Sequence, residues 1–372
     1  MKRIFCLISA ICVLLSLSMI TVPADEVGCS ARAYELYCAD NASVLSAHNA
    51  GVRLPMASTT KIMTTLLTLE AAAVDNKVVT FSDDMTAEGS SMYLKPGEQV
   101  TLYDLAVGMM MQSGNDAANA AAIAISGSIG AFADLMNKKA VELGMTDTHF
   151  VTPSGLDDDD HYTTAHDMAL LMSHALNNGE FADITSQTSM TVDFVSPPDK
   201  SVTYPNHNRL LRMYEGCIGG KTGYTDSAGR CLVTAARKNG MTLIAVTLDD
   251  RDDWDDHIRL YDYGFERYTA MPALIPDELD IVGGVSDKAA LSADSYTFIV
   301  PKDKAGDTSV RLILPVFAYA PVEKGDVAGK CICSVGGEKI GEITISFAES
   351  VPRNTEKRSF ITYIKDLFNW HS

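Results

Sequence analysis

Hydrophobic residues in the first half of the chain recur with the spacing of buried helices. The run from Ile62 to Ala73 is long and rich in leucine and alanine, which predicts a largely buried helix that begins near Ser58. Further helices are predicted where apolar residues recur three and four positions apart or where alanine dominates: 101–112, 116–125, 131–143 and 164–176. A tight turn is predicted between the first two of these helices.

Farther along, the pattern changes to alternating Val, Thr and Ile with glycine-rich turns. The strand-like runs 231–236 and 241–248 follow a glycine-rich stretch and predict an antiparallel meander, which a helix from Trp254 to about Tyr268 closes. Pro272 and Pro276 indicate a linker. Beyond them, short alternating runs continue to about residue 350, and Gly336-Gly337 is typical of a hairpin turn. The pattern therefore predicts an α+β fold with a small all-β second domain.

The first residues of the chain have the pattern of an export signal. Met1-Lys2-Arg3 precedes an apolar run that ends near Ile20, and small residues follow up to Ala24. This predicts a signal peptide over residues 1–24, cleaved after Ala24. A retained transmembrane anchor is the alternative, and the short apolar core disfavours it.

The last residues have a different apolar pattern. Large apolar side chains recur at helical spacing and basic residues lie nearby: Phe360, Ile361, Ile364, Leu367 and Phe368, with Arg353, Lys357, Arg358 and Lys365. This predicts an amphipathic helix over residues 354–372 that lies in a membrane interface. A helix that packs against its own protein is the alternative.

Composition narrows the possible functions. The chain of 372 residues is 47% hydrophobic, which is enough for a large core and a second domain, and its formal net charge of −18 argues against nucleic-acid binding. The six cysteines after the signal have no framework spacing, and Cys331 and Cys333 share one side of a predicted strand, so we expect mostly free, buried thiols. The acidic clusters 157–160 and 249–253 are interpreted as solvated loops, with calcium binding as the alternative. Neither Cys-x-x-Cys nor His-Glu-x-x-His occurs, which argues against a metal or other cofactor.

One hydroxyl near the start of the first long helix has a candidate base beside it. Residues three apart share a helical face, so Lys61 is expected to lean back over Ser58. An amine can accept the serine proton only if its pKa falls from about 10.4 toward 7, a change of roughly 4 to 5 kcal/mol. Burial and a second cation can supply it. The alternative is that Ser58 only caps the helix and Lys61 is solvated.

Two further motifs follow in order along the chain, Ser113-Gly114-Asn115 in the predicted turn and Lys221-Thr222-Gly223 in the glycine-rich stretch. With Ser58-x-x-Lys61 they resemble the signature of the penicillin-recognising serine acyl-enzymes. The chain is most similar to the low-molecular-weight penicillin-binding proteins that act as D-alanyl-D-alanine carboxypeptidases. Four more segments carry the resemblance: 91–94, 116–118, 153–156 and 205–208.

The resemblance implies a penicillin-binding/β-lactamase-like domain over residues 25–270, with an antiparallel sheet and a helical subdomain, followed by a β-rich domain over 277–350. It implies an enzyme that removes the terminal D-alanine from peptidoglycan stem pentapeptides through an acyl-enzyme, and that β-lactams acylate. It further implies an exported enzyme on the outer face of the bacterial cytoplasmic membrane. The implied catalytic residues are Ser58, Lys61, Ser113, Asn115 and Lys221, and the substrate contacts are Lys221, Thr222, Gly223 and Tyr224.

Each of these residues has an implied role. Ser58 attacks the penultimate carbonyl and Lys61 accepts its proton. Ser113 relays a proton to the leaving nitrogen and Asn115 holds the substrate's backbone. The Lys221 charge and the Thr222 hydroxyl bind the terminal carboxylate, and Gly223 lets the substrate approach the strand edge closely. The backbone N–H groups of Ser58 and Tyr224 form the oxyanion hole.

Three other functions are alternatives. A class A β-lactamase needs a glutamate with asparagine four residues later between the second and third motifs, and Glu142, Glu180 and Glu215 all lack it. A non-enzymatic wall-binding protein would lack the nucleophile. Endopeptidase activity on crosslinks stays open as an alternative. Some relatives bind the carboxylate through a downstream arginine, and Arg251 is left unassigned.

Overall fold

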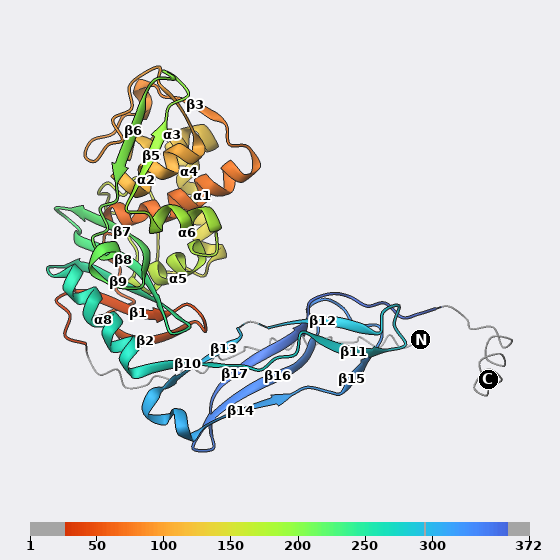
Figure 1. The fold of residues 1–372 in the computed structure, drawn as a ribbon. Coiled ribbons are helices and arrows are strands. Elements are labelled where there is room, and N and C mark those ends of the chain that lie inside the picture. Colours follow the sequence, from red (N-terminus) through yellow and green to blue (C-terminus); the bar gives the residue numbers. More distant parts are fainter. Residues whose placement is uncertain (1–26, 294, 356–372) are drawn as a thin grey trace, which may run out of the picture.

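The computed structural model describes residues 27–293 and 295–355, which form two parts (Figure 1). The larger part contains a helical lobe and a sheet lobe, and the smaller is an elongated β arm that extends to one side. The predicted signal peptide lies outside the described residues. So does the predicted C-terminal helix, apart from its first two positions.

An antiparallel sheet of five strands is the centre of the sheet lobe. Its order is β2-β1-β9-β8-β7, formed by β1 (Ala33–Cys38), β2 (Ser43–His48), β7 (Cys217–Thr225), β8 (Gly229–Lys238) and β9 (Met241–Asp250). The predicted meander is therefore confirmed. The N-terminal hairpin β1–β2 was not predicted; it joins the sheet because β1 pairs along β9. The strand β7 stays at the edge, where it has one unpaired side.

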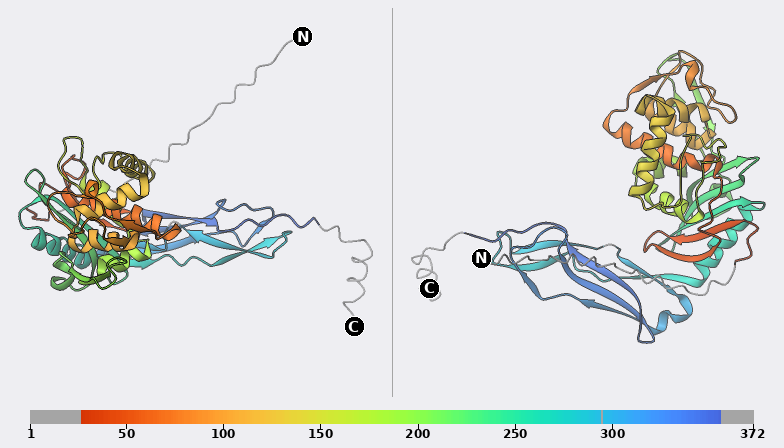
Figure 2. Two further views of the ribbon diagram at one scale, coloured as in Figure 1. Left: turned by 90° about the horizontal axis from the view of Figure 1, so that it is seen from above. Right: turned by 180° about the vertical axis from the view of Figure 1, so that it is seen from behind.

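Helices cover both faces of this sheet. The helix α8 (Asp253–Arg267) packs on one face, and α5 (Ala165–Ala175) packs on the other, against β1 and β9 (Figure 2). Leu260, Tyr261 and Phe265 of α8 are buried against the sheet, which gives this layer its own core. The resulting three-layer stack is a rigid support for the edge strand.

The helical lobe confirms the predicted helices. It contains η1 (Ala57–Thr60), η2 (Asp83–Met85), α1 (Lys61–Val74), α2 (Leu102–Gln112), α3 (Asn115–Ser126), α4 (Ile129–Glu142) and α6 (Gly179–Ser186). Two small hairpins flank them: β3 (Val78–Thr80) with β4 (Gln99–Thr101), and β5 (Ser189–Asp193) with β6 (Ser201–Pro205). The short helix α7 (Leu210–Met213) instead packs on β7, and its Leu210 belongs to the core of the sheet lobe. Within the described part of the chain no single helix has both the length and the apolarity to cross a bilayer, although α3 and α4 together, bent by 85°, meet those criteria.

The β arm is the predicted all-β domain. The strand β10 (Tyr268–Pro272) pairs with β13 (Thr297–Pro301), so Pro272 lies in a strand and not in a linker as predicted. The main sheet has the order β14-β16-β17-β12-β11-β15. Its strands are β11 (Glu278–Val282), β12 (Lys288–Ala293), β14 (Thr308–Ile313), β15 (Phe317–Tyr319), β16 (Val327–Val335) and β17 (Glu338–Phe347), and the six-residue turn η3 (Lys302–Asp307) precedes β14. The Gly336-Gly337 hairpin is confirmed, with positive φ at both glycines.

Two further predictions concern cysteines and acidic residues. All six cysteines after the signal are free, and Cys331 and Cys333 are both buried on one side of β16, as predicted. The cluster 157–160 is an exposed loop. The cluster 249–253 was predicted to be solvated, and this is wrong for Asp250 and Asp253. Both are buried because β9 ends there and α8 begins, and Asp253 pairs with an arginine of β8.

Candidate active site

The candidate nucleophile lies in the segment that we call the nucleophile turn, residues 56–60. Ser58 follows Ala57, whose φ is +46°, a left-handed conformation that is unusual for a residue with a Cβ. Ser58 then lies inside the 3₁₀ turn η1 and makes no side-chain cap, so the interpretation of Ser58 as a helix cap is wrong. The 3₁₀ turn ends at Thr60 and α1 begins at the next residue, Lys61. This geometry directs the Ser58 hydroxyl toward Lys61.

Lys61 is the first residue of α1, and its side chain is fully buried. Its Nζ lies 2.9 Å from Ser58 Oγ, 2.6 Å from Asn115 Oδ1 and 2.6 Å from the Ser154 carbonyl oxygen. A neutral amine has two N–H bonds and one lone pair. The two N–H bonds match the two acceptors, which leaves the lone pair for the Ser58 hydroxyl. The alternative of a solvated lysine is therefore wrong.

The electrostatics of the site favour this neutral amine. Burial lowers the pKa of Lys61 well below its usual value, because the low-dielectric interior disfavours the charged form. The positive charge of Lys221 lowers this pKa further, and the carboxylate of Asp116 partly opposes the shift. Burial and a second cation are the two causes that the sequence predicted.

The predicted turn between α2 and α3 brings Ser113 and Asn115 to the site. Ser113 ends α2 in the left-handed region, with φ 59° and ψ 30°, and Asn115 begins α3. Two hydrogen bonds hold the Asn115 amide: Oδ1 accepts from Lys61, and Nδ2 donates to the Glu88 carbonyl oxygen at 2.6 Å. In this state Asn115 orients Lys61, in addition to the substrate contact implied by the resemblance.

Asp116 is a site residue that sequence reasoning did not recognise. Its carboxylate accepts hydrogen bonds from the backbone N–H groups of Met92 and Leu94, at 2.8 and 3.1 Å, and from the Ser91 hydroxyl at 2.7 Å. It is buried, and it ties residues 88–94, which we call the rim loop, to the start of α3. The sequence showed only an acidic residue at a helix start, the same feature that marks an ordinary helix terminus.

The third motif lies on the edge strand β7. Lys221 is buried, and its Nζ donates to Ser113 Oγ at 3.0 Å and to the Thr222 carbonyl oxygen at 2.8 Å. Burial lowers the pKa of Lys221 to about 7. A Cβ at Gly223 would lie 3.0 Å from the backbone nitrogens of Ser58 and Thr59, so only glycine lets β7 approach the nucleophile turn this closely.

A cleft of about 370 Å³ opens over these groups. It is lined by residues from the nucleophile turn, the rim loop, the loop after α4 and the end of β7: Ser58, Glu88, Gly89, Ser90, Asn115, Ser154, Gly155, Leu156, Tyr224, Thr225 and Asp226. Lys61 and Lys221 lie buried behind its wall. The three predicted motifs thus meet at one site, although 163 positions separate Ser58 from Lys221. Arg251 is exposed and does not line the cleft.

Family comparisons agree with this arrangement. Residues 20–252 match the family described as D-alanyl-D-alanine carboxypeptidase, and residues 278–353 match the C-terminal domain of penicillin-binding protein 5. Similar curated proteins include the D-alanyl-D-alanine carboxypeptidases DacF of Bacillus subtilis, 32% identical over 92% of this chain and 90% of its own length, and DacC of Escherichia coli, 33% identical over 89% and 86%.

Solved structures show the same fold. Penicillin-binding protein 5 of Haemophilus influenzae covers 87% of this chain and 98% of its own, with a TM-score of 0.72 and 29% identity. A DD-transpeptidase of Streptomyces K15 covers 64% of this chain and 98% of its own, with a TM-score of 0.61 and 29% identity. The chain belongs to the D-alanyl-D-alanine carboxypeptidase family of low-molecular-weight penicillin-binding proteins and is a serine-type D-Ala-D-Ala carboxypeptidase.

Proposed function

We propose that Ser58 carries the acyl group in this carboxypeptidase reaction. Its Oγ attacks the carbonyl carbon of the penultimate D-alanine, and Lys61 Nζ takes the hydroxyl proton. The C–N bond to the terminal D-alanine then breaks, the leaving nitrogen receives a proton, and water later hydrolyses the Ser58 ester. The observation that carries this proposal is the buried Lys61 amine, whose two N–H bonds have acceptors and whose third contact is Ser58 Oγ.

The proton path to the leaving nitrogen runs through Ser113 in this proposal. Its Oγ accepts a hydrogen bond from Lys221 Nζ and can in turn donate to a nitrogen in the cleft. The N–H groups of Ser58 and Tyr224 stabilise the oxyanion, an interaction worth about 3 kcal/mol per donor. Support comes from the close packing of β7 on the nucleophile turn at Gly223.

The substrate's terminal carboxylate is bound by Lys221 and Thr222. Both belong to β7, and the buried ammonium of Lys221 lies 3.0 Å from Ser113 Oγ. In a β-lactam, the carboxylate and the strained amide are placed relative to each other much like the terminal carboxylate and the scissile amide of the peptide substrate. Such compounds would therefore acylate Ser58 as substrate analogues.

Labelling with a fluorescent penicillin tests the nucleophile. Ser58→Ala should abolish covalent labelling and D-alanine release and keep the melting temperature, because Ser58 makes no cap and loses only one contact. Ser186→Ala, at a half-buried serine of α6 that does not line the cleft, is the matched control and should label normally. Full labelling of a folded Ser58→Ala protein would exclude Ser58 as the nucleophile.

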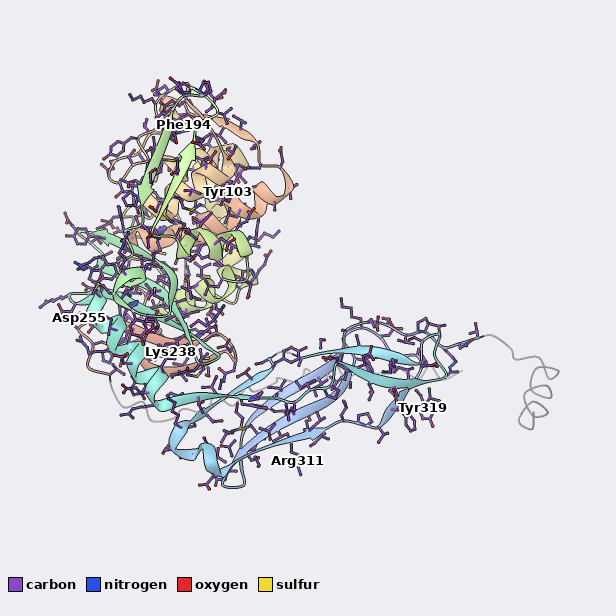
Figure 3. All side chains as sticks on the ribbon, in the orientation of Figure 1. Tyr103, Phe194, Lys238, Asp255, Arg311 and Tyr319 are labelled. Carbon is purple, nitrogen blue, oxygen red and sulfur yellow. The ribbon has the colours of Figure 1, made fainter. Side chains whose placement is uncertain are left out.

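The site of action is the cell wall, since the family acts on peptidoglycan. We further propose that residues 1–24 direct export and that residues 354–372 hold the mature enzyme on the outer face of the cytoplasmic membrane. The chain leaves the described structure beside Gly283, where Asn354 N–H donates to the Gly283 carbonyl oxygen. The next residue back, Val282, pairs with Tyr319, which lies at the end of the β arm far from the helical lobe (Figure 3). An anchor there would keep the cleft at a distance from the membrane.

A further inference from the structure

One buried histidine lies against the active site and has no role in the reaction described above. His161 comes from the acidic loop after α4, and only 3% of its surface is exposed. Its Nε2 lies 2.8 Å from Thr60 Oγ1, and its Nδ1 accepts from the Val151 N–H at 2.9 Å. The ring thus bridges the nucleophile turn and the loop that contains Ser154.

The direction of these hydrogen bonds is determined. Because Nδ1 accepts from a backbone N–H, the ring proton is on Nε2, and Nε2–H donates to Thr60 Oγ1. The Thr60 hydroxyl then donates to the Ala57 carbonyl oxygen at 2.8 Å. An imidazolium would place a second N–H against that of Val151. In keeping with this, burial lowers the pKa of His161 to about 4.

This chain of hydrogen bonds ends at Ala57, a strained residue of the nucleophile turn. Ala57 has φ +46° and immediately precedes Ser58. Its carbonyl oxygen is also packed against Gly155, where a Cβ would lie 1.9 Å away. A non-glycine residue in the left-handed region persists only when surrounding contacts hold it. The Thr60 hydroxyl supplies one such contact, and His161 orients that hydroxyl.

The other side of the ring acts on Lys61. The hydrogen bond that His161 accepts comes from the Val151 N–H, in the irregular segment that leads to Ser154, and the Ser154 carbonyl is one of the two acceptors of the Lys61 amine. Thr64 of α1 adds a hydrogen bond to the Pro153 carbonyl oxygen at 2.6 Å. A single ring therefore connects the turn that carries the nucleophile to the loop that orients its base.

We infer that His161 is a positioning residue for acylation, which acts through Thr60 on the Ala57-Ser58 turn and through the 151–154 segment on Lys61. The inference rests on the proposal that Ser58 is the nucleophile and Lys61 its base. It predicts that loss of the relay slows acylation while the non-covalent affinity for substrate stays nearly unchanged, because the cleft lining is intact. A displacement of about 1 Å at a reacting atom can cost about a hundredfold in rate.

Two pairs of variants at the two relay positions test it. His161→Phe keeps the ring and loses both nitrogens, and Thr60→Val keeps the shape and loses the hydroxyl. His161→Gln and Thr60→Ser keep the hydrogen-bonding groups. We expect His161→Phe and Thr60→Val to lower kcat and the acylation rate by about ten- to a hundredfold with KM within about twofold. His161→Gln and Thr60→Ser should stay within about threefold of the parent in both rates.

The double variant separates positioning from packing. If both residues act in one relay, the double variant His161→Phe with Thr60→Val should acylate no more slowly than the worse single variant. If the two substitutions cause independent packing defects, their losses in acylation rate should multiply. His257→Phe is the matched control: this histidine is also fully buried between threonines, but it belongs to α8 in the sheet lobe, so the variant should shift the melting temperature and leave the acylation rate unchanged.

The outcomes are distinguishable from failure of the proposed mechanism. Persistent labelling of Ser58→Ala would remove the mechanism itself. With that variant unlabelled, a folded His161→Phe that acylates at the parent rate, or losses that multiply in the double variant, would overturn the inference. If His161→Phe does not fold, the Thr60→Val and Thr60→Ser pair decides: equal rates in the two would overturn it as well.

Discussion

Lys221 is predicted to set the alkaline limit of substrate recognition. Its ammonium is buried behind the cleft wall, and burial lowers its pKa from the usual 10.5 to about 7. If Lys221 binds the terminal carboxylate, as proposed, only the protonated fraction of the free enzyme recognises that group. Raising the pH above 7 then deprotonates Lys221, so the carboxylate is no longer recognised, while the Lys61 amine stays neutral.

The size of the effect follows from that pKa. With a value of about 7, Lys221 is protonated in about half of the molecules at pH 7, about a tenth at pH 8 and about a hundredth at pH 9. Because kcat/KM reports the free enzyme, it should fall about tenfold per pH unit on this limb, or about 1.4 kcal/mol each. The limb for kcat should lie at higher pH, since a bound carboxylate stabilises the ammonium.

The assay compares two peptides that differ only at the terminal group. D-alanine release from an acylated D-Ala-D-Ala peptide is measured from about pH 6 to about pH 10, beside release of D-alaninamide from the matching C-terminal amide. The amide lacks the group that Lys221 recognises, so its kcat/KM should not show the fall above pH 7. Equal falls for both peptides, or a carboxylate profile that stays flat to about pH 9, would refute the role of Lys221.

Four further predictions follow from other contacts. Lys61→Arg should lower acylation about as much as Lys61→Ala, by about 10²- to 10⁴-fold, because guanidinium keeps its proton; stopped-flow acylation near the parent rate would exclude a base at this position. Gly155→Ala, whose Cβ would overlap a carbonyl oxygen of the nucleophile turn, should lower stability by about 1 to 3 kcal/mol and slow acylation, as urea unfolding and labelling would report. The buried Glu35 carboxylate accepts from His166 Nδ1 at 2.9 Å and raises the pKa of that histidine. Its contribution to stability is therefore complete below about pH 6.5 and is lost as the pH rises through the raised pKa; His166→Gln should remove this slope in urea unfolding, and an unchanged slope would contradict the assignment. Deleting the residues after Thr355 should release an active enzyme with an unchanged melting temperature from the membrane fraction, whereas a lower melting temperature would favour a tail that packs on its own protein.

Local patterns in the sequence determined most elements and the pairing of Ser58 with Lys61. Helical periodicity is a property of neighbouring residues, so the long buried helix and the turn at Ser113 could be predicted from them. The spacing of three residues likewise brings an amine beside a hydroxyl once a helical turn forms. The three motifs in order then identified the family, and with it the chemistry.

Tertiary structure decided what surrounds these groups. The β1–β2 hairpin joins the sheet only through pairing with β9, far along the chain. The Ser154 carbonyl reaches Lys61, and the His161 ring reaches Thr60, each across about a hundred residues, and no local pattern predicts either contact. The two lysines are buried only because the helical lobe and the sheet lobe pack together, and this burial lowers the pKa of Lys61 and of Lys221. Desolvation by distant segments is therefore the physical reason that an ordinary Ser-x-x-Lys pair can supply the nucleophile and base that we propose.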